Sequence, residues 1–153
     1  MKMTLARRVA EPAWPYRLLV EADIPVLGRL MLESFRGTPD DEGEELPDAI
    51  AEVSRTFDGA YGRFMTDCSP AVENDGAIIS VCLVTLIEEH GLPFVTFSMT
   101  HPAHRRRGLA AFLLTEAGNR LLDHGHEEVA LVVTEANLPA MRMYEHLGFH
   151  VVT

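Results

Sequence analysis

A run of three arginines followed by a glycine constrains the fold of this chain more than any other feature. The segment Arg105–Ala110 reads RRRGLA, and it follows a β-branched and aromatic stretch that begins at Phe94. A helical pattern starts directly after it, so the segment should lie at a strand-to-helix junction. The first turn of a helix has unpaired backbone N–H groups and the positive end of the helix dipole, and both attract anions. The junction therefore predicts a phosphate-binding site.

The charge of the chain favours a polyphosphate ligand at this junction. With 13 Lys and Arg against 23 Asp and Glu, the net charge is −10, and His104 with the three arginines forms a strongly basic patch. The sequence contains neither G-x-x-x-x-G-K-[ST] nor G-x-G-x-x-G, which excludes the phosphate loops of nucleoside triphosphatases and dinucleotide-binding folds. Acidic residues elsewhere would repel a nucleic acid backbone, so no nucleic acid partner is expected.

Length and composition predict a single domain over residues 1–153. A chain of 153 residues with 47% apolar and 24% charged residues can bury a core without disulfides or metal. No apolar run approaches the roughly 18 residues of a membrane span. Arg7 and Arg8 interrupt any secretory apolar region, so we expect a cytoplasmic protein without a membrane partner. Cys68 and Cys82 have no C-x-x-C spacing and are expected to be small buried residues.

Hydrophobic spacing and turn residues predict the order of helices and strands. Asp23 is a plausible N-cap for the first helix, Gly37 ends that helix, and Gly125 and Gly148 end the last two. The predicted helices span residues 24–35, 47–57, 109–124 and 139–147. The predicted strands span residues 5–9, 16–20, 64–72, 77–88, 92–100, 129–133 and 149–152.

The connections between these elements predict an α+β fold. Turn signals at residues 74–76 and 89–91 join three strands into an antiparallel meander. The strand over 92–100, the helix after it and the apolar strand over 129–133 then form a right-handed parallel crossover. The expected architecture is a mixed, mostly antiparallel sheet with helices on both faces and one parallel strand pair.

Two motifs resemble those of one known family. Met99–Pro102 and the following R-x-x-G-x-A of Arg105–Ala110 are similar to a strand exit and the acyl-CoA pyrophosphate loop, Q/R-x-x-G-x-G/A, of the GNAT superfamily of acetyl-CoA-dependent N-acetyltransferases. Asn137–Phe149 is similar to that family's second motif, an Asn followed by a helix that carries a Tyr and ends in Gly-Phe. The resemblance covers about residues 16–152, leaves 1–15 as an N-terminal extension, and implies a GNAT-like sheet whose parallel strands splay at the CoA site.

The resemblance implies acetyl-CoA as the acyl donor substrate. The backbone of Met99 and Thr100 would pair with the pantetheine as an added strand, and Asn137 would both cap its helix and touch the CoA arm. The pyrophosphate would lie on the backbone of the loop formed by Arg105, Arg106, Arg107, Gly108, Leu109 and Ala110. Whether the acyl group is acetyl or longer stays open.

Tyr144 occupies the position that in the family protonates the departing thiolate, so the resemblance implies that it is the general acid. A phenol with an unperturbed pKa of about 10 can donate a proton to the thiolate of a thiol with a pKa of about 8.5 only in a favourable geometry. No general base is obvious: Glu88 or Glu89 at the hairpin, Glu135, the acidic loop and a water chain all stay open.

The most acidic stretch, residues 38–45, allows two interpretations. Acidic residues before a helix are readily solvated, and they stabilise the first turn of that helix. In the GNAT family, however, the connection between the first two helices lines the acceptor site, and an acidic rim there would attract a cationic amine. The expected activity is acetyl transfer to a primary amine of a small, cationic acceptor. The alternative is a GNAT-like domain that binds acyl-CoA as a sensor or interaction module without turnover.

The histidines do not predict a metal site. His101 and His104 flank a proline in a loop, and His146 and His150 straddle a helix terminator. Neither pair holds two ligands on one helical face, and no Cys or acid completes a set.

The C-terminal edge of the predicted sheet lacks a partner. Members of the GNAT family commonly continue into a further strand, whereas this sequence stops at Thr153. An open strand edge at residues 149–152 would invite association. We expect the edge to be covered by the N-terminal stretch 5–20 or by the second protomer of a homodimer.

Overall fold

The computed structural model describes residues 1–11 and 13–152. The helices are α1 (Ile24–Phe35), α2 (Leu46–Phe57), α3 (Leu109–Asp123) and α4 (Leu138–Leu147), with short 3-10 turns η1 (Glu21–Asp23), η2 (Thr66–Cys68) and η3 (Pro102–His104). The strands are β1 (Lys2–Thr4), β2 (Arg17–Leu18), β3 (Arg63–Phe64), β4 (Pro70–Asn74), β5 (Ala77–Ile87), β6 (Leu92–Thr100) and β7 (Glu128–Leu131).

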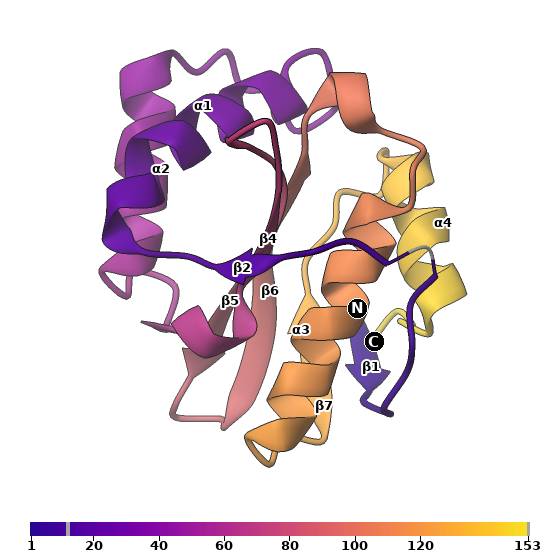
Figure 1. The fold of residues 1–153 in the computed structure, drawn as a ribbon. Coiled ribbons are helices and arrows are strands. Elements are labelled where there is room, and N and C mark those ends of the chain that lie inside the picture. The colour runs from indigo at the N-terminus through magenta and orange to yellow at the C-terminus, as the bar shows by residue number, and fades with distance from the viewer. Residues whose placement is uncertain (12, 153) are drawn as a thin grey trace.

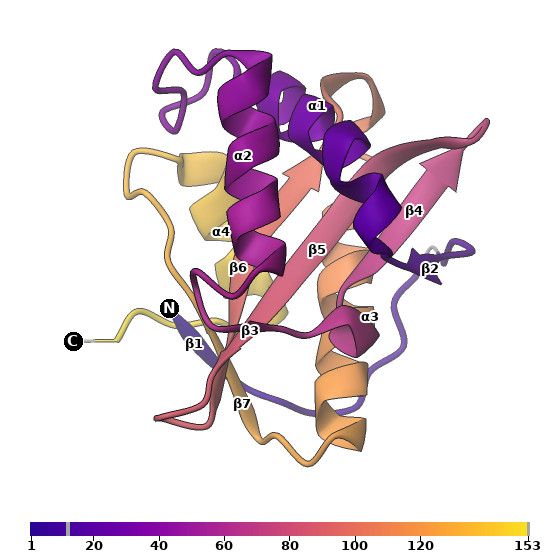
Figure 2. The same ribbon diagram turned by 90° about the vertical axis from the view of Figure 1, so that its left-hand side faces the viewer.

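Within the described residues these strands form one sheet in the order β1-β7-β6-β5-β4-β2, with β3 paired to β5. Every pairing is antiparallel except that of β6 with β7. Helices α1 and α2 cover one face, while α3 and α4 lie on the other side (Figure 1). Figure 2, turned by 90°, shows α1 and α2 in front of the sheet and α3 behind it. The predicted α+β architecture, with helices on both faces and one parallel pair, is confirmed.

Each face of the sheet has its own apolar core because successive side chains of a strand point to opposite faces. On β5, Val81 and Leu83 pack in the core under α1 and α2, while Cys82 and Val84 pack in the core under α3. The predicted apolar stripe of α3 is buried in the second core; it consists of Leu109, Phe112, Leu113, Ala117 and Leu121. This stripe fixes the N-terminus of α3 against the sheet.

The parallel strands β6 and β7 separate soon after they meet. In the described chain their ladder contains Phe94 opposite Ala130 and Val95 opposite Leu131, whereas β6 continues to Thr100. The predicted strand over 129–133 therefore ends early, because the chain leaves the sheet after Leu131 and the side chain of Val132 is 89% exposed. The separation leaves one edge of β6 open beside the loop before α3.

The first strand is β1, not the predicted strand over residues 5–9. Met3 and Leu5 are buried, whereas the Arg7–Arg8 pair is exposed and its side chains bind groups near the surface of α3 and α4. Two adjacent exposed arginines break the alternation that a half-buried strand requires. The alternating apolar residues Met3 and Leu5 indicate the first strand better than the pattern of residues 5–9.

Strand β1 lies between β7 and the end of the chain. It pairs antiparallel with β7, and Lys2 exchanges two hydrogen bonds of 2.9 Å with His150. The predicted strand over 149–152 is reduced to this one bridge, because Val151 and Val152 are exposed and outside the sheet. The N-terminal stretch thus covers the edge with residues 2–4 rather than 5–20, and the homodimer stays a prediction.

Two other local predictions need correction. The strand predicted over 64–72 is divided into β3, η2 and β4, because the Ser69 hydroxyl donates to the Met65 carbonyl and accepts from the N–H of Val84 in place of a regular ladder. The strand predicted over 16–20 shortens to β2. The bounds of α1 and β6 are as predicted, and those of α2, α3, α4 and β5 are close to prediction.

Asp23 also differs in its role, since its side chain makes no cap to α1. Its carboxylate instead accepts two hydrogen bonds from the Arg17 guanidinium, at 2.8 and 2.9 Å, and one from the N–H of Val20. The hydrogen bonds with Arg17 hold the pKa of Asp23 below its usual value. The residue joins β2 to the start of α1.

Candidate functional site

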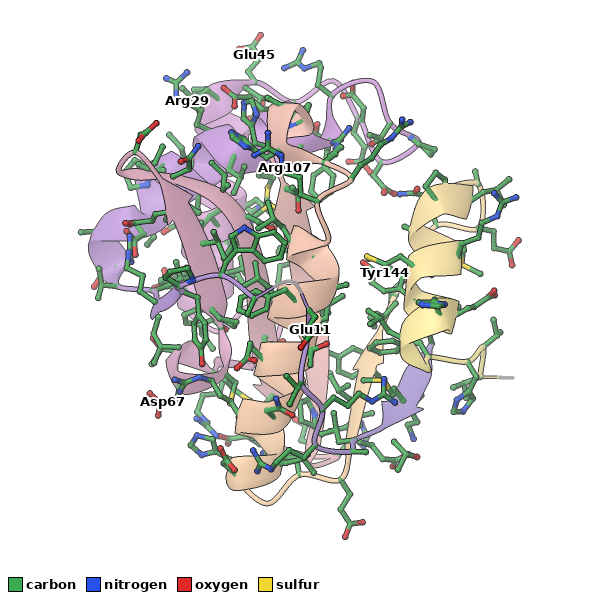
Figure 3. The ribbon with its side chains drawn as sticks, turned by 45° about the vertical axis from the view of Figure 1, so that its right-hand side comes forward. Glu11, Arg29, Glu45, Asp67, Arg107 and Tyr144 are labelled. Carbon is green, nitrogen blue, oxygen red and sulfur yellow. The ribbon has the colours of Figure 1, made fainter. Side chains whose placement is uncertain are left out.

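A cleft of about 2340 Å³ extends along the open edge of β6. One wall comes from α1, α2 and the loop between them, and the other from the loop before α3, residues 131–134, 136 and 137, and α4. Figure 3 shows Tyr144 on α4 facing the space toward α3. The two walls differ in the kind of polar group that they offer.

The loop between β6 and α3 offers a row of backbone N–H groups. Gly108, the N-cap of α3, has φ 76°, and Arg106 has φ 65°, so both adopt the left-handed conformation. Within the described residues the N–H groups from Arg106 to Ala111 have no acceptor, and the bond from Phe112 to the Gly108 carbonyl starts the helix. Successive N–H groups at the positive end of a helix bind anions. A pyrophosphate can therefore be held here by the main chain.

The three arginine side chains of this loop have different surroundings. Arg105 donates to the carbonyl of Ser34 at the end of α1, so its guanidinium is engaged within the fold. Arg106 lines the cleft together with His104. Arg107 is outside the lining, and its Nη1 lies 3.4 Å from the Nδ1 of His104. Arg105 and Arg106 thus both line the cleft, and among the described residues the guanidinium of Arg106 has no hydrogen-bond or ion-pair partner.

Backbone groups along β6 alternate between β5 and the cleft. The N–H of His101 bonds to the carbonyl of Ile79, so Met99, two residues earlier, also directs its backbone groups toward β5. The backbone groups of Ser98 and Thr100 consequently face the open side, where an extended ligand can add as a further strand. The buried side chain of Met99 anchors this part of β6 in the core under α1 and α2.

Tyr144 lines the cleft from α4. Its ring packs edge-on against Phe149 with 5.7 Å between centroids. Burial raises the pKa of Tyr144 to about 12; Cys82 adds to the shift, while Ser98 opposes it. The hydroxyl therefore stays protonated near neutral pH and is available to donate a hydrogen bond.

Asn137 links the two walls of the cleft. Its Oδ1 accepts the N–H of Ala140 at 3.3 Å, which is the cap expected for α4. Its Nδ2 donates to Asp40 at 3.5 Å, and the hydroxyl of Thr134 donates to the same carboxylate. Asp40 thus extends from the α1–α2 loop to the connection between β7 and α4.

Part of the acidic stretch faces the cleft. Asp40, Glu42 and Glu44 line it, whereas Asp41 and Glu45 are not in the lining. Asp41 accepts two backbone N–H groups of its own loop, from the glycines on either side, and these hold its pKa below the usual value. The stretch therefore combines acids that order the loop with acids that face the cleft.

The candidate general bases are separated in space. Glu88 and Glu89 line the cleft at the β5–β6 hairpin, and Glu88 pairs with Arg63 at 2.8 Å. Glu135 is not in the lining. The base consequently stays unassigned.

The wall formed by α1 and α2 also holds a polar pair that the sequence did not predict. Glu52 of α2 and Tyr61 both line the cleft, and the hydroxyl of Tyr61 donates to the Glu52 carboxylate. Asp48, one turn before Glu52, also lines the cleft, so the i, i+4 spacing of the two acids was the available signal. The position of Tyr61 depends on the loop after α2, which no periodicity predicts.

Metal sites and membrane spans were searched in residues 1–11 and 13–152. No group of three or more His, Cys, Asp and Glu side chains there is placed to hold a metal ion. No helix in the same residues combines the length and the apolar character needed to cross a membrane.

Comparison with family models matches residues 28–149 to the Acetyltransferase (GNAT) family. The chain belongs to this family. The matched residues include the loop before α3 and the Asn137–Phe149 motif, so the resemblance stated for those two motifs is confirmed. No curated protein matches the chain.

Solved structures with this GNAT fold differ widely in sequence. The PaiA N-acetyltransferase from Thermoplasma acidophilum in complex with coenzyme A is 19% identical, with 90% of each chain covered and a TM-score of 0.72. AAC(6')-Iy in complex with the bisubstrate analog CoA-S-monomethyl-acetylneamine is 17% identical, with 90% of each chain covered and a TM-score of 0.65. A transcriptional regulator from Bacillus halodurans C-125 is 20% identical, with 91% of this chain and 94% of that chain covered and a TM-score of 0.69.

Proposed function

We propose that this protein transfers an acetyl group from acetyl-CoA directly to a primary amine of a small, cationic acceptor. The observation that carries the proposal is one cleft with unpaired backbone N–H groups on one wall and carboxylates on the other. The first wall suits the pyrophosphate of the donor, and the second suits a cationic amine. Relatives of the same fold in complex with coenzyme A and with a CoA bisubstrate analog support the choice of donor.

The donor is proposed to lie along β6 and the start of α3. Its pyrophosphate accepts N–H groups between Arg106 and Ala110, with Arg105 ordering the loop through the end of α1. Its pantetheine adds to the open edge at Thr100, next to Met99. Asn137 contacts the arm of the donor from the N-terminus of α4.

The transfer requires one bond to form and one to break. The neutral amine nitrogen attacks the thioester carbonyl carbon, a C–N bond forms, and the C–S bond breaks with its electron pair on sulfur. The amine nitrogen gives up one proton, and the sulfur gains one to become the thiol. Tyr144 is proposed to donate to the sulfur as its charge develops, because its protonated hydroxyl lines the cleft.

The raised pKa of Tyr144 defines how it acts. With a pKa of about 12, the phenol is a weaker acid than a free thiol, whose pKa is about 8.5. A hydrogen bond to the developing thiolate is therefore its first contribution. Burial of the sulfur beside Tyr144 raises the pKa of the thiol as well, because the thiolate, like the phenolate, loses hydration. The pKa values of the phenol and the thiol are therefore closer to each other in the cleft.

The alternative is a GNAT domain that binds acyl-CoA without turnover. The unassigned base and the likeness to a protein described as a transcriptional regulator favour it. Both proposals use the same donor site, but only acetyl transfer requires the hydroxyl of Tyr144.

Release of free thiol from acetyl-CoA, measured against a panel of primary amines, separates the proposals. We expect amine-dependent thiol release above the rate of thioester hydrolysis, with the N-acetylated product confirmed by mass spectrometry. Tight acetyl-CoA binding without amine-dependent release would favour the binding module.

A further inference from the structure

Three aromatic rings from separate elements form one apolar surface in the acceptor side of the cleft. Phe35 ends α1, Tyr61 follows α2, and Phe97 lies on β6. The centroid of Phe97 lies 6.4 Å from that of Phe35 and 6.3 Å from that of Tyr61. All three line the cleft, and Tyr61 is 42% exposed. Apolar surface left open in this way favours an apolar ligand segment.

A carboxylate lies directly beside this surface. The hydroxyl of Tyr61 donates to one oxygen of Glu52, and Nη2 of Arg55 donates to the other at 3.1 Å. The bond with Glu52 raises the pKa of Tyr61, so the phenol stays protonated and keeps the carboxylate in place. The Arg55 side chain is 56% exposed, and exposed pairs of this kind contribute little. A ligand ammonium can therefore replace Arg55 at Glu52.

Glu52 is better suited to hold an ammonium than to receive the reacting amine. A carboxylate stabilises the charged form of a neighbouring amine and raises its pKa, whereas acetyl transfer needs the neutral form. A cation bound at Glu52 is consequently a second group of the acceptor, separate from the nitrogen that reacts. The three rings beside Glu52 can accommodate the apolar chain that joins the two groups and add cation–π attraction.

We propose that the acceptor is a diamine with an apolar linker, in which one ammonium binds Glu52 and the linker packs on Phe35, Tyr61 and Phe97. This inference rests on the proposed acetyltransferase function. A polyhydroxylated aminosugar fits this surface less well, because its hydroxyl groups would lose water without gaining partners from the rings.

The test compares diamines with monoamines of equal chain length, using putrescine, cadaverine and hexamethylenediamine against butylamine, pentylamine and hexylamine. We expect a kcat/KM at least about tenfold higher for the best diamine than for its monoamine, from one charge-assisted contact. Glu52→Gln should remove this preference by lowering the diamine kcat/KM to about that of the monoamine. Arg55→Gln should raise the diamine preference, because it removes the competing guanidinium.

Asp58→Asn is the matched control, since Asp58, the C-cap residue of α2, is another cleft acid and has no aromatic partner among the described contacts. If Glu52→Gln and Asp58→Asn lower the preference for diamines equally, the preference comes from the overall negative charge of the cleft. That result would overturn the inference. Turnover of monoamines and diamines at similar rates would overturn it too, while leaving the acetyltransferase function intact. No turnover with any amine, despite acetyl-CoA binding in calorimetry, would remove the proposed function and this inference with it.

Discussion

We propose that the two walls of the cleft, called here the donor wall and the acceptor wall, bind their ligands with different parts of the chain. The donor wall uses main-chain N–H groups, whose positions follow from local conformation at Arg106 and Gly108. The acceptor wall uses side chains from distant elements, such as Glu52 of α2 and Phe97 of β6. Main-chain recognition requires a short motif with fixed backbone angles, whereas side-chain recognition can change one residue at a time. The donor wall is therefore constrained and the acceptor wall adaptable.

Contacts of Arg105 and Asp40 connect these walls, and Nε2 of His101 in the loop before α3 also lies 2.9 Å from a carboxylate oxygen of Glu33 on α1. The guanidinium of Arg105 in the donor loop binds the carbonyl of Ser34, next to Phe35 of the acceptor surface. The carboxylate of Asp40 in the acceptor loop accepts hydrogen bonds from Thr134 and Asn137 on the donor side. We therefore expect that ligand binding on one wall alters the geometry of the other.

The largest effect is expected at Gly108. An Asp there would place a carboxylate beside the proposed phosphate site, so Gly108→Asp should weaken acetyl-CoA binding about a hundredfold or more through repulsion and lost N–H contacts. Titration calorimetry measures this directly. Gly108→Asn imposes the same strain at φ 76° without the charge and separates the two causes.

Gly125→Asp is a control at the other end of the same helix. Gly125 also has a positive φ, 86°, and open space for a side chain. We expect unchanged acetyl-CoA affinity in this variant. Unchanged acetyl-CoA affinity in a folded Gly108→Asp protein would contradict the proposed position of the donor site. The comparison of the two walls would then fail as well.

The next largest effect is expected at Tyr144. Loss of a hydroxyl that acts as thiolate charge develops should lower kcat about a hundredfold and leave acetyl-CoA affinity unchanged, because the ring is retained. Since the pKa of Tyr144 is raised to about 12, its proton is retained up to high pH. Wild-type kcat should rise as the amine deprotonates and should not fall before the pH approaches that value.

Tyr16→Phe is the matched control, because the Tyr16 ring packs on Phe112 and its hydroxyl accepts a bond from Arg120, outside the cleft lining. Turnover in this variant should equal that of the wild type. Equal turnover in Tyr144→Phe, measured where chemistry limits the rate, would exclude the proposed role of the hydroxyl.

A smaller effect is expected from the acidic loop. Glu42 and Glu44 line the cleft, so their joint change to Gln should raise KM for a cationic amine by about two- to fivefold at low salt. The difference should disappear at high salt, where screening removes long-range attraction, and acetyl-CoA affinity should stay constant. Asp41 is left unchanged because its carboxylate orders the loop.

Glu45→Gln supplies the control for that prediction. Glu45 belongs to the same loop, is outside the cleft lining and lies at the edge of the molecule in Figure 3. A salt-sensitive rise in KM that is as large in Glu45→Gln would assign the effect to net charge alone. If KM for the cationic amine does not rise in the Glu42 and Glu44 variant, the loop has no role in acceptor binding and is only a solvated connection.

The difference between the walls also explains what the sequence could predict. The loop from Arg105 to Ala110 and the cap at Asn137 depend on local conformation, so their residues form readable motifs. The Tyr61–Glu52 pair and the ring of Phe35 depend on how α1 and α2 pack against β6, and no local pattern encodes that packing. In the same way, the place of β1 beside β7 depends on contacts between opposite ends of the chain.

The fold itself was predictable where periodicity was strong. The bounds of α1 and the full length of β6 follow from apolar spacing and flanking glycines. The strand predicted over 64–72 was wrong, because side-chain hydrogen bonds of Ser69 compete with the ladder. Errors therefore lie at segments whose hydrogen bonds are made by side chains or by distant strands.

The smallest effect is expected where the two walls meet, at the contact between Asp40 and Thr134. Asp40→Ala and Thr134→Val each remove one side of the same hydrogen bond, so each should raise acceptor KM by about twofold through a looser α1–α2 loop. If the contact acts as a unit, the double variant should be no worse than the more affected single variant, which corresponds to a coupling of about 0.4 kcal/mol. Strictly additive effects would mean that the two residues act independently. In that case the walls would bind their ligands without communication through this contact, and the contacts of Arg105 with Ser34 and of His101 with Glu33 would be the next to test.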